Sequence, residues 1–409
     1  MAVVRGCNGV VLVTERGDVW TYKEVPERDT RVTCVTHPEA GVEIYDGERI
    51  FMVAAGCMHY ACVSAKGSVF TWGRNEEHQL GTTFEPVLVG HNRYSYRQST
   101  TADRPVRLDK TLFGASPAVM VACGGVHTVV LTAAGGVWTF GQTCHTNPTG
   151  HGTNIIRVPT LIPVENFDSV PIVMVAAGQA HTVVLGDDGR VWTCGSNRHG
   201  QQGRVTQQGR DRVHAPALLD ALPSRGGAAQ AQAAGACATD DAVVLVAADG
   251  DKSAAVTHRG ALWVWPRHAS DSSTWHPVRV GTDSAFRGSP VLMVACAQSH
   301  WLVVCEDGAL WKVDNGTLLQ TCIGGPQFGQ PKFVTVSAYR KQSFGVTEDG
   351  ELYTWGQPDE RWAADELPRL TLRQVGGARI GPCHSLSQMQ ALAFAMGTHC
   401  RLGASTAGP

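Results

Sequence analysis

The sequence predicts an all-β protein, a seven-bladed β-propeller built from four-stranded antiparallel blades. Two observations lead to this prediction: one sequence pattern recurs along the chain of 409 residues, and each copy has the hydrophobic pattern of short antiparallel strands. Repeats at intervals of roughly 40 to 70 residues are typical of propellers, in which each repeat forms one sheet. We therefore expect a single domain over residues 1–409.

The repeated pattern is clearest in residues 172–203, IVMVAAGQAHTVVLGDDGRVWTCGSNRHGQQG. A first apolar segment ends at Gly178, a second begins at His181, and a third follows the turn at Asp188-Gly189. Short apolar runs bounded by glycine predict strands, and the glycine of the acidic turn predicts a tight hairpin. We expect the variable linkers to supply a fourth, outer strand. The aromatic residue of the third segment recurs at Trp20, Phe70, Trp138, Trp192, Trp263, Trp311 and Tyr353.

Small residues before the repeat glycine indicate the crowded hub of a ring, where a large side chain would clash. These triplets are Ala54-Ala55-Gly56, Ala122-Cys123-Gly124 and Ala176-Ala177-Gly178. Residues 391–403 form a partial eighth copy of this strand, and the first copy begins abruptly within the same strand. We expect the N- and C-terminal segments to meet in one blade and close the ring.

Two insertions interrupt the repeats, at residues 82–117 and 221–242. The first is polar and rich in arginine, and the second consists largely of Ala, Gln and Gly. Surface loops tolerate extra length at a small cost in free energy, so both insertions are open to interpretation as excursions without function. The arginine and tyrosine residues of the first insertion also make it a candidate for partner binding.

Charge and composition exclude several classes of function. The formal net charge is −2 at pH 7 and no long basic cluster occurs, so we expect no direct nucleic-acid ligand. No apolar run is long enough for a signal peptide or a membrane span. The 13 cysteines are scattered without a C-x-x-C pair, which is typical of free thiols in a reducing compartment. The sequence therefore predicts an intracellular protein, cytoplasmic or nuclear.

The histidines and glycines of the pattern are predicted to be structural. The histidine position is filled by His59, His127, His181 and His300, and in other copies by Gly9, Asp251 and Gln342. Equivalent positions around a propeller lie too far apart for metal–nitrogen bonds of about 2.1 Å, so we expect a repeated hydrogen bond instead of a metal site. The glycines of the pattern are Gly56, Gly124 and Gly178 before the histidine, and Gly189, Gly308 and Gly350 in the hairpin turn.

No nucleophile with a base and an orienting acid stands out. Asp188 belongs to a turn, and the pair Ser299-His300 lacks an acidic partner in the local pattern. No phosphate-binding or dinucleotide-binding glycine motif is present. We therefore expect no catalytic residue and no cofactor.

The pattern A-x-G-x-x-H, followed by an acidic or glycine-rich turn, G-x-V-W and G-Q-x-G, resembles the regulator of chromosome condensation family of seven-bladed propellers. This resemblance covers essentially the whole chain and is strongest in the second to fourth copies. It implies a propeller fold and one of three kinds of function. Members of this family include an exchange factor for a small nuclear GTPase, a plant ultraviolet-B photoreceptor and modules that bind proteins.

The residues between the repeat glycine and histidine distinguish these functions. In the exchange factor they include acidic and histidine side chains that face the GTPase, and in the photoreceptor they include tryptophan. Here they are Cys57-Met58, Gly125-Val126, Gln179-Ala180 and, after an Ala in place of the glycine, Gln298-Ser299. The sequence therefore favours a non-enzymatic protein-interaction propeller, with nucleotide exchange on a small Ran-like GTPase as the alternative.

We expect protein partners, a monomeric state and contact residues where the repeat pattern breaks down. Arginine and tyrosine are favoured at binding hot spots. The candidate partner-binding residues are Tyr94, Tyr96 and Arg97 in the first insertion, Tyr339, Arg340 and Lys341 in the seventh copy, and Met58, Gln179 and Gln298 between glycine and histidine.

Overall fold

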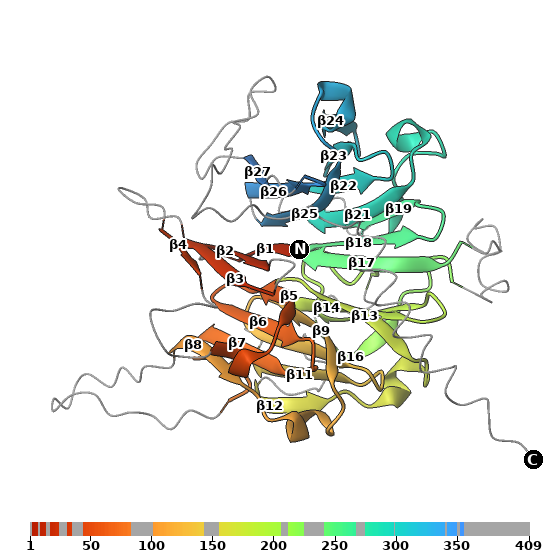
Figure 1. The fold of residues 1–409 in the computed structure, drawn as a ribbon. Helices are drawn as coiled ribbons and strands as arrows, with labels where there is room; N and C mark the ends of the chain where they lie inside the picture. The colour runs from red at the N-terminus through yellow and green to blue at the C-terminus, as the bar shows by residue number, and fades with distance from the viewer. Residues whose placement is uncertain are drawn as a thin grey trace, which may run out of the picture.

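The computed structural model shows an all-β protein made of seven antiparallel sheets (Figure 1). In the residues that it describes, the strands are accompanied only by short 3-10 turns. These residues are 2–6, 9–13, 17–23, 31–34, 44–82, 101–142, 155–205, 212–224, 241–266, 275–297, 299–339, 342–349 and 352–355.

We number the sheets as blades 1 to 7 in chain order. Blade 1 contains β1 (Ala2–Gly6), β2 (Gly9–Val13), β3 (Val19–Lys23) and β4 (Arg31–Cys34). Blade 2 contains β5 (Ile50–Ala55), β6 (His59–Ser64), β7 (Val69–Arg74) and β8 (Thr101–Arg107). Blade 3 contains β9 (Ala118–Cys123), β10 (His127–Thr132), β11 (Val137–Gln142) and β12 (Ile155–Leu161). Blade 4 contains β13 (Ile172–Ala177), β14 (His181–Gly186), β15 (Val191–Ser196) and β16 (Arg212–Leu218).

Blade 5 contains β17 (Val243–Asp249), β18 (Lys252–Thr257), β19 (Leu262–Trp265) and β20 (Val278–Arg279). Blade 6 contains β21 (Val291–Cys296), β22 (His300–Cys305), β23 (Leu310–Asp314) and β24 (Gln320–Gly324). Blade 7 contains three strands in the described residues, β25 (Phe333–Tyr339), β26 (Gln342–Thr347) and β27 (Leu352–Trp355). In every blade the strands pair in chain order, so each blade is a meander.

The first strands of the seven blades form the inner ring. Each first strand contacts the first strand of the next blade, from β1 through β5, β9, β13, β17 and β21 to β25. β25 in turn contacts β1, and this contact closes the ring in the described part of the chain. Small residues such as Ala54 and Ala176 on these strands are buried, as the crowding of a hub requires. The seven-bladed propeller expected from the sequence is therefore confirmed.

We expected the N- and C-terminal segments to meet in one blade, and the described residues show only the N-terminal segment in that blade. In the described residues, all four strands of blade 1 come from residues 2–34. The segment 391–403, which we expected to join it, lies outside the described residues.

The first insertion is partly regular structure. Residues 101–107 of the stretch 82–117 form β8, the outer strand of blade 2, and a 3-10 turn, η2 (Lys110–Phe113), follows it. The rest of the stretch up to residue 100 lies outside the described residues, apart from Thr82. Most of the second insertion, residues 225–240, lies outside them as well.

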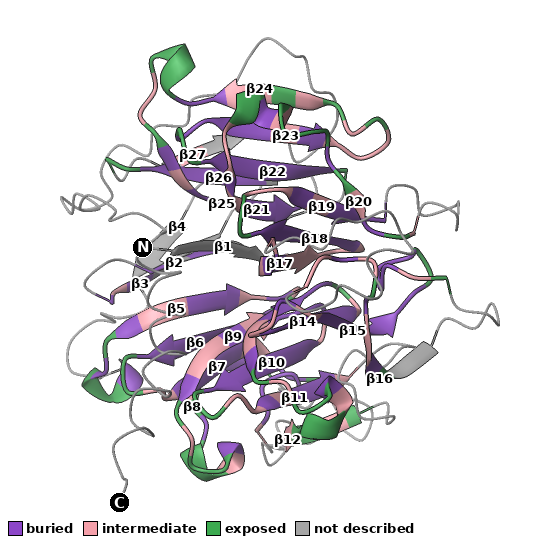
Figure 2. Ribbon diagram, turned by 90° about the vertical axis from the view of Figure 1, so that its right-hand side faces the viewer, coloured by how far each residue is buried: buried purple, intermediate pink, exposed green. Residues whose placement is uncertain are grey.

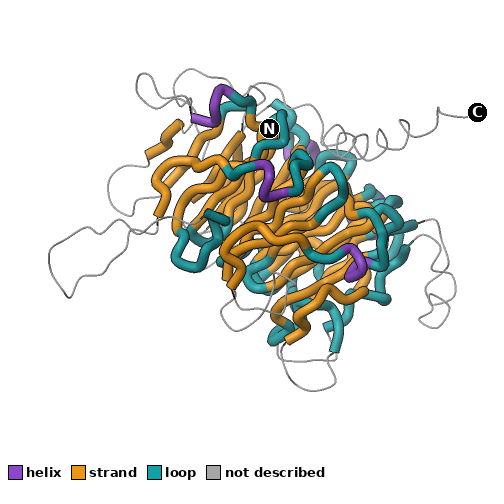
Figure 3. Tube along the Cα trace, turned by 90° about the horizontal axis from the view of Figure 1, so that it is seen from below, coloured by secondary structure: helices purple, strands orange, loops and turns teal. Residues whose placement is uncertain are grey.

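In blades 2, 3, 5 and 6 the second strand is the most buried element, and in blade 4 the second and third strands are both fully buried. All six residues of β6, β10, β14, β18 and β22 are buried, because each strand is flanked by two strands of its blade and covered by the neighbouring blades (Figure 2). Figure 3 shows the strands forming the body of the molecule, with turns and 3-10 segments around it. The positions that follow the repeat histidine are therefore core positions.

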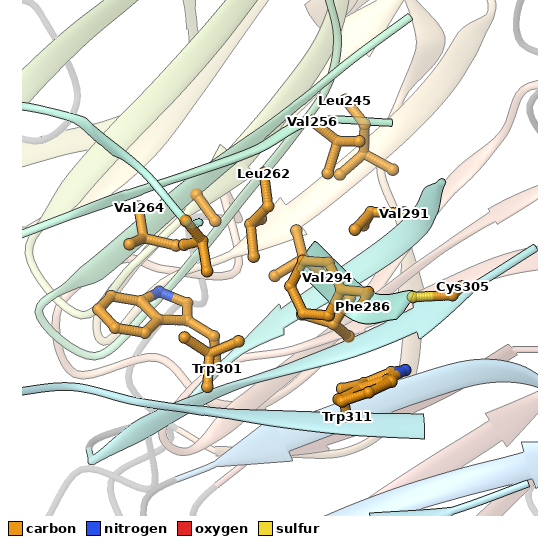
Figure 4. Packing of buried hydrophobic residues seen from close by; sticks show 14 of the residues in the cluster. Leu245, Val256, Leu262, Val264, Phe286, Val291, Val294, Trp301, Cys305 and Trp311 are labelled. Carbon is orange, nitrogen blue, oxygen red and sulfur yellow. The ribbon is translucent and has the colours of Figure 1, made fainter. Parts of the chain in front are cut away.

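The hydrophobic core is divided among the gaps between blades. Six clusters of buried residues each join two consecutive blades, from blades 1 and 2 to blades 6 and 7. The cluster between blades 5 and 6 packs Leu262 and Val264 against Val294, Trp301 and Trp311 (Figure 4). A single sheet cannot bury both of its faces, and stacking the blades side by side buries them.

A second aromatic residue supports the aromatic residue of the third strand. The 3-10 turns η1 (Ile44–Gly47), η2, η3 (Val164–Phe167) and η6 (Ala285–Gly288) come shortly before the first strand of a blade. In each case an aromatic ring of the turn packs edge-on against the third strand of that blade, a favourable geometry for two rings. The pairs are Tyr45 with Phe70, Phe113 with Trp138, Phe167 with Trp192, and Phe286 with Trp311, with ring centroids 5.1, 5.9, 5.8 and 5.7 Å apart.

Candidate functional site

The candidate binding surface is the face of the ring on which the first strand of each blade turns into the second. We call it the hairpin face. Met58 between β5 and β6 is 38% exposed, and Gln179 between β13 and β14 is exposed. Each is held by a rigid pair of strands, so the face is a fixed array of short turns with different side chains.

Loops after the third strand form the second part of the hairpin face. In blade 2, Oδ1 of Asn75 accepts from Leu80 N, and its Nδ2 donates to Thr82 O. In blade 4, Asn197 makes the same two bonds, with Gln202 N and Arg204 O. The asparagine therefore fixes the Q-x-G segment of each loop as a compact turn that reaches the next blade.

The repeat histidines connect neighbouring blades. His59 Nε2 lies 2.9 Å from Thr128 Oγ1 of blade 3, and Thr128 Oγ1 donates to Gln79 O of blade 2. Because the hydroxyl hydrogen goes to the carbonyl, His59 Nε2 carries the hydrogen of the first bond. The same bond joins three other pairs of blades, through His127 and Thr182 at 3.1 Å, His181 and Ser253 at 2.7 Å, and His300 and Ser343 at 3.3 Å.

The repeat glycine is required by the histidine that follows it. A Cβ atom on Gly178 would lie 2.0 Å from Cε1 of His181, and one on Gly124 would lie 2.1 Å from Cε1 of His127. Gly56 has the same relation to His59 at 2.4 Å. The pair of residues thus forms one structural unit in which the imidazole lies on the glycine backbone.

Burial keeps these imidazoles neutral. It lowers the pKa of His59 and His300 to about 4 and that of His127 and His181 to about 3. For His127, the neighbouring repeat histidines His59 and His181 lower the pKa further. Nδ1 of His59, His127 and His181 has no hydrogen-bond partner among the described residues, so a proton on that atom would be buried without an acceptor.

Blade 5 replaces the histidine with lysine. Lys252 is the first residue of β18, where the other blades have His181 or His300, so the expected assignment of Asp251 to the histidine position is wrong by one residue. Lys252 Nζ donates to Pro266 O and to Asn315 Oδ1, at 3.1 and 2.7 Å. It also lies 5.4 Å from the centre of the Trp301 ring.

This lysine makes the same blade-to-blade connection by different chemistry. Trp301 follows His300 and occupies the place where Thr128, Thr182 and Ser253 have their hydroxyl groups. A cation over an aromatic ring replaces the histidine–hydroxyl bond at this junction. Burial lowers the pKa of Lys252 to about 8.

The corrected register places a carboxylate on the hairpin face. Asp251 lies at the position of Met58, immediately before the residue that starts the second strand. Its Oδ1 accepts from Gln201 Nε2 at 2.7 Å, and its Oδ2 lies 3.9 Å from His199 Nε2. Aligning the repeats in the sequence missed this acidic group, because Asp249 stands where the other blades' pattern has the repeat glycine, as at Gly178.

Blade 2 presents a mixed apolar and charged group on the same face. Arg74 Nη1 donates to Met58 Sδ at 3.4 Å, and its Nη2 forms an ion pair with Glu76. The two groups, around Met58 and around Asp251, belong to different blades and have different chemistry.

Most candidate contact residues from the sequence lie outside the described residues. They are Tyr94, Tyr96, Arg97, Gln298, Arg340 and Lys341. Tyr339 is the last residue of β25, and its side chain is not described. The turn glycine Gly350 also lies outside, whereas Gly189 and Gly308 are found in their hairpin turns with φ of 83° and 78°.

In the described ranges the site carries no arrangement typical of covalent catalysis. Asp188 accepts from Arg190 N and pairs with the Arg190 guanidinium, so it serves its turn. Ser299 Oγ lies 3.2 Å from His300 Nδ1, and the ring of His300 is buried against blade 7. No group of three or more metal-ligating side chains occurs among the described residues. No helix in this part of the chain is long and apolar enough to cross a membrane.

Comparison with known proteins identifies the repeat. The family model of the regulator of chromosome condensation (RCC1) repeat matches residues 66–131 and residues 172–201. The human regulator of chromosome condensation is 25% identical over 407 residues, which cover 88% of this chain and 85% of that protein. The human E3 ubiquitin-protein ligase HERC2 is 26% identical over 353 residues, 82% of this chain, and this chain spans only 6% of its length.

Solved structures agree on the fold. Human WBSCR16 has a TM-score of 0.62 at 20% identity, covering 83% of this chain and 84% of that one. Prp20p of Saccharomyces cerevisiae, described with its binding properties to Gsp1p and histones, has a TM-score of 0.58 at 19% identity, covering 76% and 72%. The fold and the repeated glycine–histidine unit thus define a seven-bladed propeller built from repeats of this type. The chain contains repeats of the regulator of chromosome condensation type, in residues 66–131 and 172–201.

Proposed function

We propose that this protein is a non-enzymatic interaction propeller that binds partner proteins through its hairpin face. One observation favours this function. The side chains that repeat from blade to blade point into the gaps between blades and hold them together, whereas the turns of the hairpin face differ from blade to blade. A rigid ring with variable turns is suited to recognising a shaped protein surface.

Two groups on the hairpin face supply the recognition chemistry. Met58 beside Arg74 offers an apolar contact with a neighbouring charge, and methionine and arginine are favoured in protein interfaces. Asp251 beside His199 offers a carboxylate that is 42% exposed and held in place by Gln201. A partner that covers both groups would contact blades 2, 4 and 5 together.

Nucleotide exchange on a small GTPase is the second candidate function. The mouse secretion-regulating guanine nucleotide exchange factor is 26% identical over 266 residues, 63% of this chain and 54% of that protein. Asp251 adds an acidic side chain to the hairpin face, and acidic groups were the feature whose absence weighed against exchange in the sequence. An exchange factor in this sense would act by binding, without covalent chemistry.

Affinity isolation with paired variants tests the interaction function. Met58→Glu combined with Gln179→Arg changes the hairpin face without touching the glycine–histidine units. The control, Lys110→Glu combined with Arg259→Glu, alters exposed residues at the other end of the blades. We expect the first variant to lose specific partners that the wild type and the control retain in equal amounts. Equal recovery by both variants would rule out the hairpin face as the binding surface.

A kinetic assay separates the two candidates. Release of a fluorescent guanine nucleotide from a small Ran-like GTPase is measured with catalytic amounts of this protein. An interaction propeller leaves the release rate unchanged, whereas an exchange factor accelerates it. Acceleration that is lost on Asp251→Asn would establish the second candidate and refute the first.

A further inference from the structure

The outer strands of blades 2, 3 and 4 are matched residue for residue. β8, β12 and β16 each contain seven residues with proline at the fifth. Their last residues, Arg107, Leu161 and Leu218, pair with the third-strand aromatic residues Phe70, Trp138 and Trp192. Any difference between these strands therefore compares equivalent positions on the rim of the ring.

β12 differs from β8 at three exposed positions. The first, fourth and seventh residues of β8 are Thr101, Arg104 and Arg107, and all three are exposed. Charge and proline on an edge strand are the usual protection against unwanted contacts. β12 retains the proline, but its three equivalent residues are Ile155, Val158 and Leu161, which are 41%, 41% and 39% exposed.

A fourth exposed apolar residue follows the strand. Val164, the first residue of η3, follows three positions after Leu161 and is 47% exposed. We call Ile155, Val158, Leu161 and Val164 the rim row. Most of the other large exposed hydrophobic side chains in the described residues are isolated, so the rim row is a local concentration. β12 pairs only with β11 and forms the outer edge of blade 3 (Figure 1).

A cationic group lies within the rim row. Arg157 is exposed between Ile155 and Val158, and in the described part of the chain its guanidinium has no hydrogen bond or ion pair. Burial lowers the pKa of His78, which lies on the loop that blade 2 extends toward blade 3, and the nearby positive charge of Arg157 lowers this pKa further. The charge beside the apolar residues is therefore positive.

We propose that the rim row is a docking surface for a partner protein segment that carries aliphatic side chains next to a carboxylate. The aliphatic side chains would cover Ile155, Val158 and Leu161, and the carboxylate would pair with Arg157. Symmetric pairing of two β12 strands would bring two positively charged Arg157 side chains together, which disfavours a second copy of this chain as the occupant. This surface lies on the rim and goes beyond the function proposed for the hairpin face.

Fluorescence anisotropy with defined peptides tests this proposal. The probe is a fluorescein-labelled ten-residue peptide of alternating leucine and glutamate, and the comparison peptide has lysine in place of glutamate. We expect the wild type to bind the glutamate peptide about tenfold more tightly than the lysine peptide. Ile155→Thr combined with Val158→Thr and Leu161→Thr should weaken binding about tenfold or more. Arg157→Glu should reverse the preference between the two peptides.

The matched control is Arg104→Thr on β8, which changes the position equivalent to Val158 and should leave binding unchanged. An unchanged thermal midpoint verifies that each variant is folded. The proposal is overturned if the wild type does not bind the glutamate peptide, or if the triple variant binds it as well as the wild type. Sedimentation showing a wild-type dimer that the triple variant abolishes would also overturn it, since a second copy would then cover the surface. Hairpin-face variants should bind the peptide normally, which separates this test from that of the proposed function.

Discussion

Replacing His181 with glutamine should make the protein less sensitive to acid. The His181 ring is neutral and buried, donates its Nε2 hydrogen to Ser253 of the next blade, and has no acceptor near Nδ1 among the described residues. Its pKa of about 3 lies far below the ordinary value of 6.5. Glutamine cannot take up a proton, and Gln342 stands at the equivalent position, the first residue of β26 in blade 7.

The size of the effect follows from the difference in pKa between the folded and unfolded chain. Because the folded pKa is the lower one, the unfolded chain binds protons first as the pH falls below 6.5. The full contribution to stability is present above that pH and declines until the pH reaches the folded pKa. When the pH falls from 7 to 5, each buried histidine lowers the free energy of unfolding by about 2 kcal/mol, and four lower it by about 8 kcal/mol. This loss is comparable to the whole stability of a typical domain.

Urea denaturation followed by tryptophan fluorescence at pH 7, 6 and 5 measures this effect. The wild type should lose most of its free energy of unfolding over this range. His181→Gln should be less stable than the wild type at pH 7 but should lose about 2 kcal/mol less on acidification. The exposed His258, changed to glutamine, is the control and should retain the wild-type pH profile. Identical profiles for His181→Gln and the wild type would refute the assignment of a buried neutral histidine.

Three further substitutions test the contacts between and within blades by the free energy of unfolding. Gly124→Ala should destabilise the protein by about 3 kcal/mol, because its Cβ would overlap the His127 ring, whereas Gly135→Ala, with its nearest contact at 3.6 Å, should cost about 1 kcal/mol. Lys252→Met should cost about 2 kcal/mol, because it leaves Asn315 Oδ1 and Pro266 O without their donor; an unchanged urea midpoint would show that the lysine does not connect blades 5 and 6. Phe167→Ala should cost about 4 kcal/mol through loss of its packing on Trp192, and a cost below 1 kcal/mol would mean that η3 does not support the blade.

The strands and their order were predictable because the signals are local. The valine-rich runs, the turn glycines and the aromatic residue of the third strand all lie within one copy of the pattern, and β13, β14 and β15 follow the expected boundaries closely. The small residues of the hub were also visible in the sequence, since their reason is the crowding of the inner strands.

Contacts between copies were not predictable in the same way. The acceptor of His59 is Thr128, which is 69 residues away, and nothing inside one copy identifies it. A weaker signal existed, because a hydroxyl residue follows the histidine or its replacement in several copies, as at Thr128, Thr182 and Ser253. The turn residues Phe113 and Phe167 were missed because they lie in the variable linkers, where the repeat alignment stops.

The charge on the hairpin face was misjudged for a similar reason. Blade 5 has Asp249 where blades 2, 3 and 4 have the repeat glycine, and Asp251 was placed one residue too far along the pattern. Strand pairing in blade 5, with Ser253 opposite Trp265, sets the correct register. Where the sequence departs from the repeat pattern, as in blade 5, only the strand pairing of the structure shows which residue fills which position.

Amide hydrogen exchange over the whole chain tests the closed seven-bladed ring most directly. The structure predicts that the fully buried strands β6, β10, β14, β15, β18 and β22 exchange slowest, and that β1 and β25 are protected together, since they pack against each other. Rapid exchange of β1 and β25 beside a protected body from β5 to β24 would show that the ring does not close, and would contradict this account.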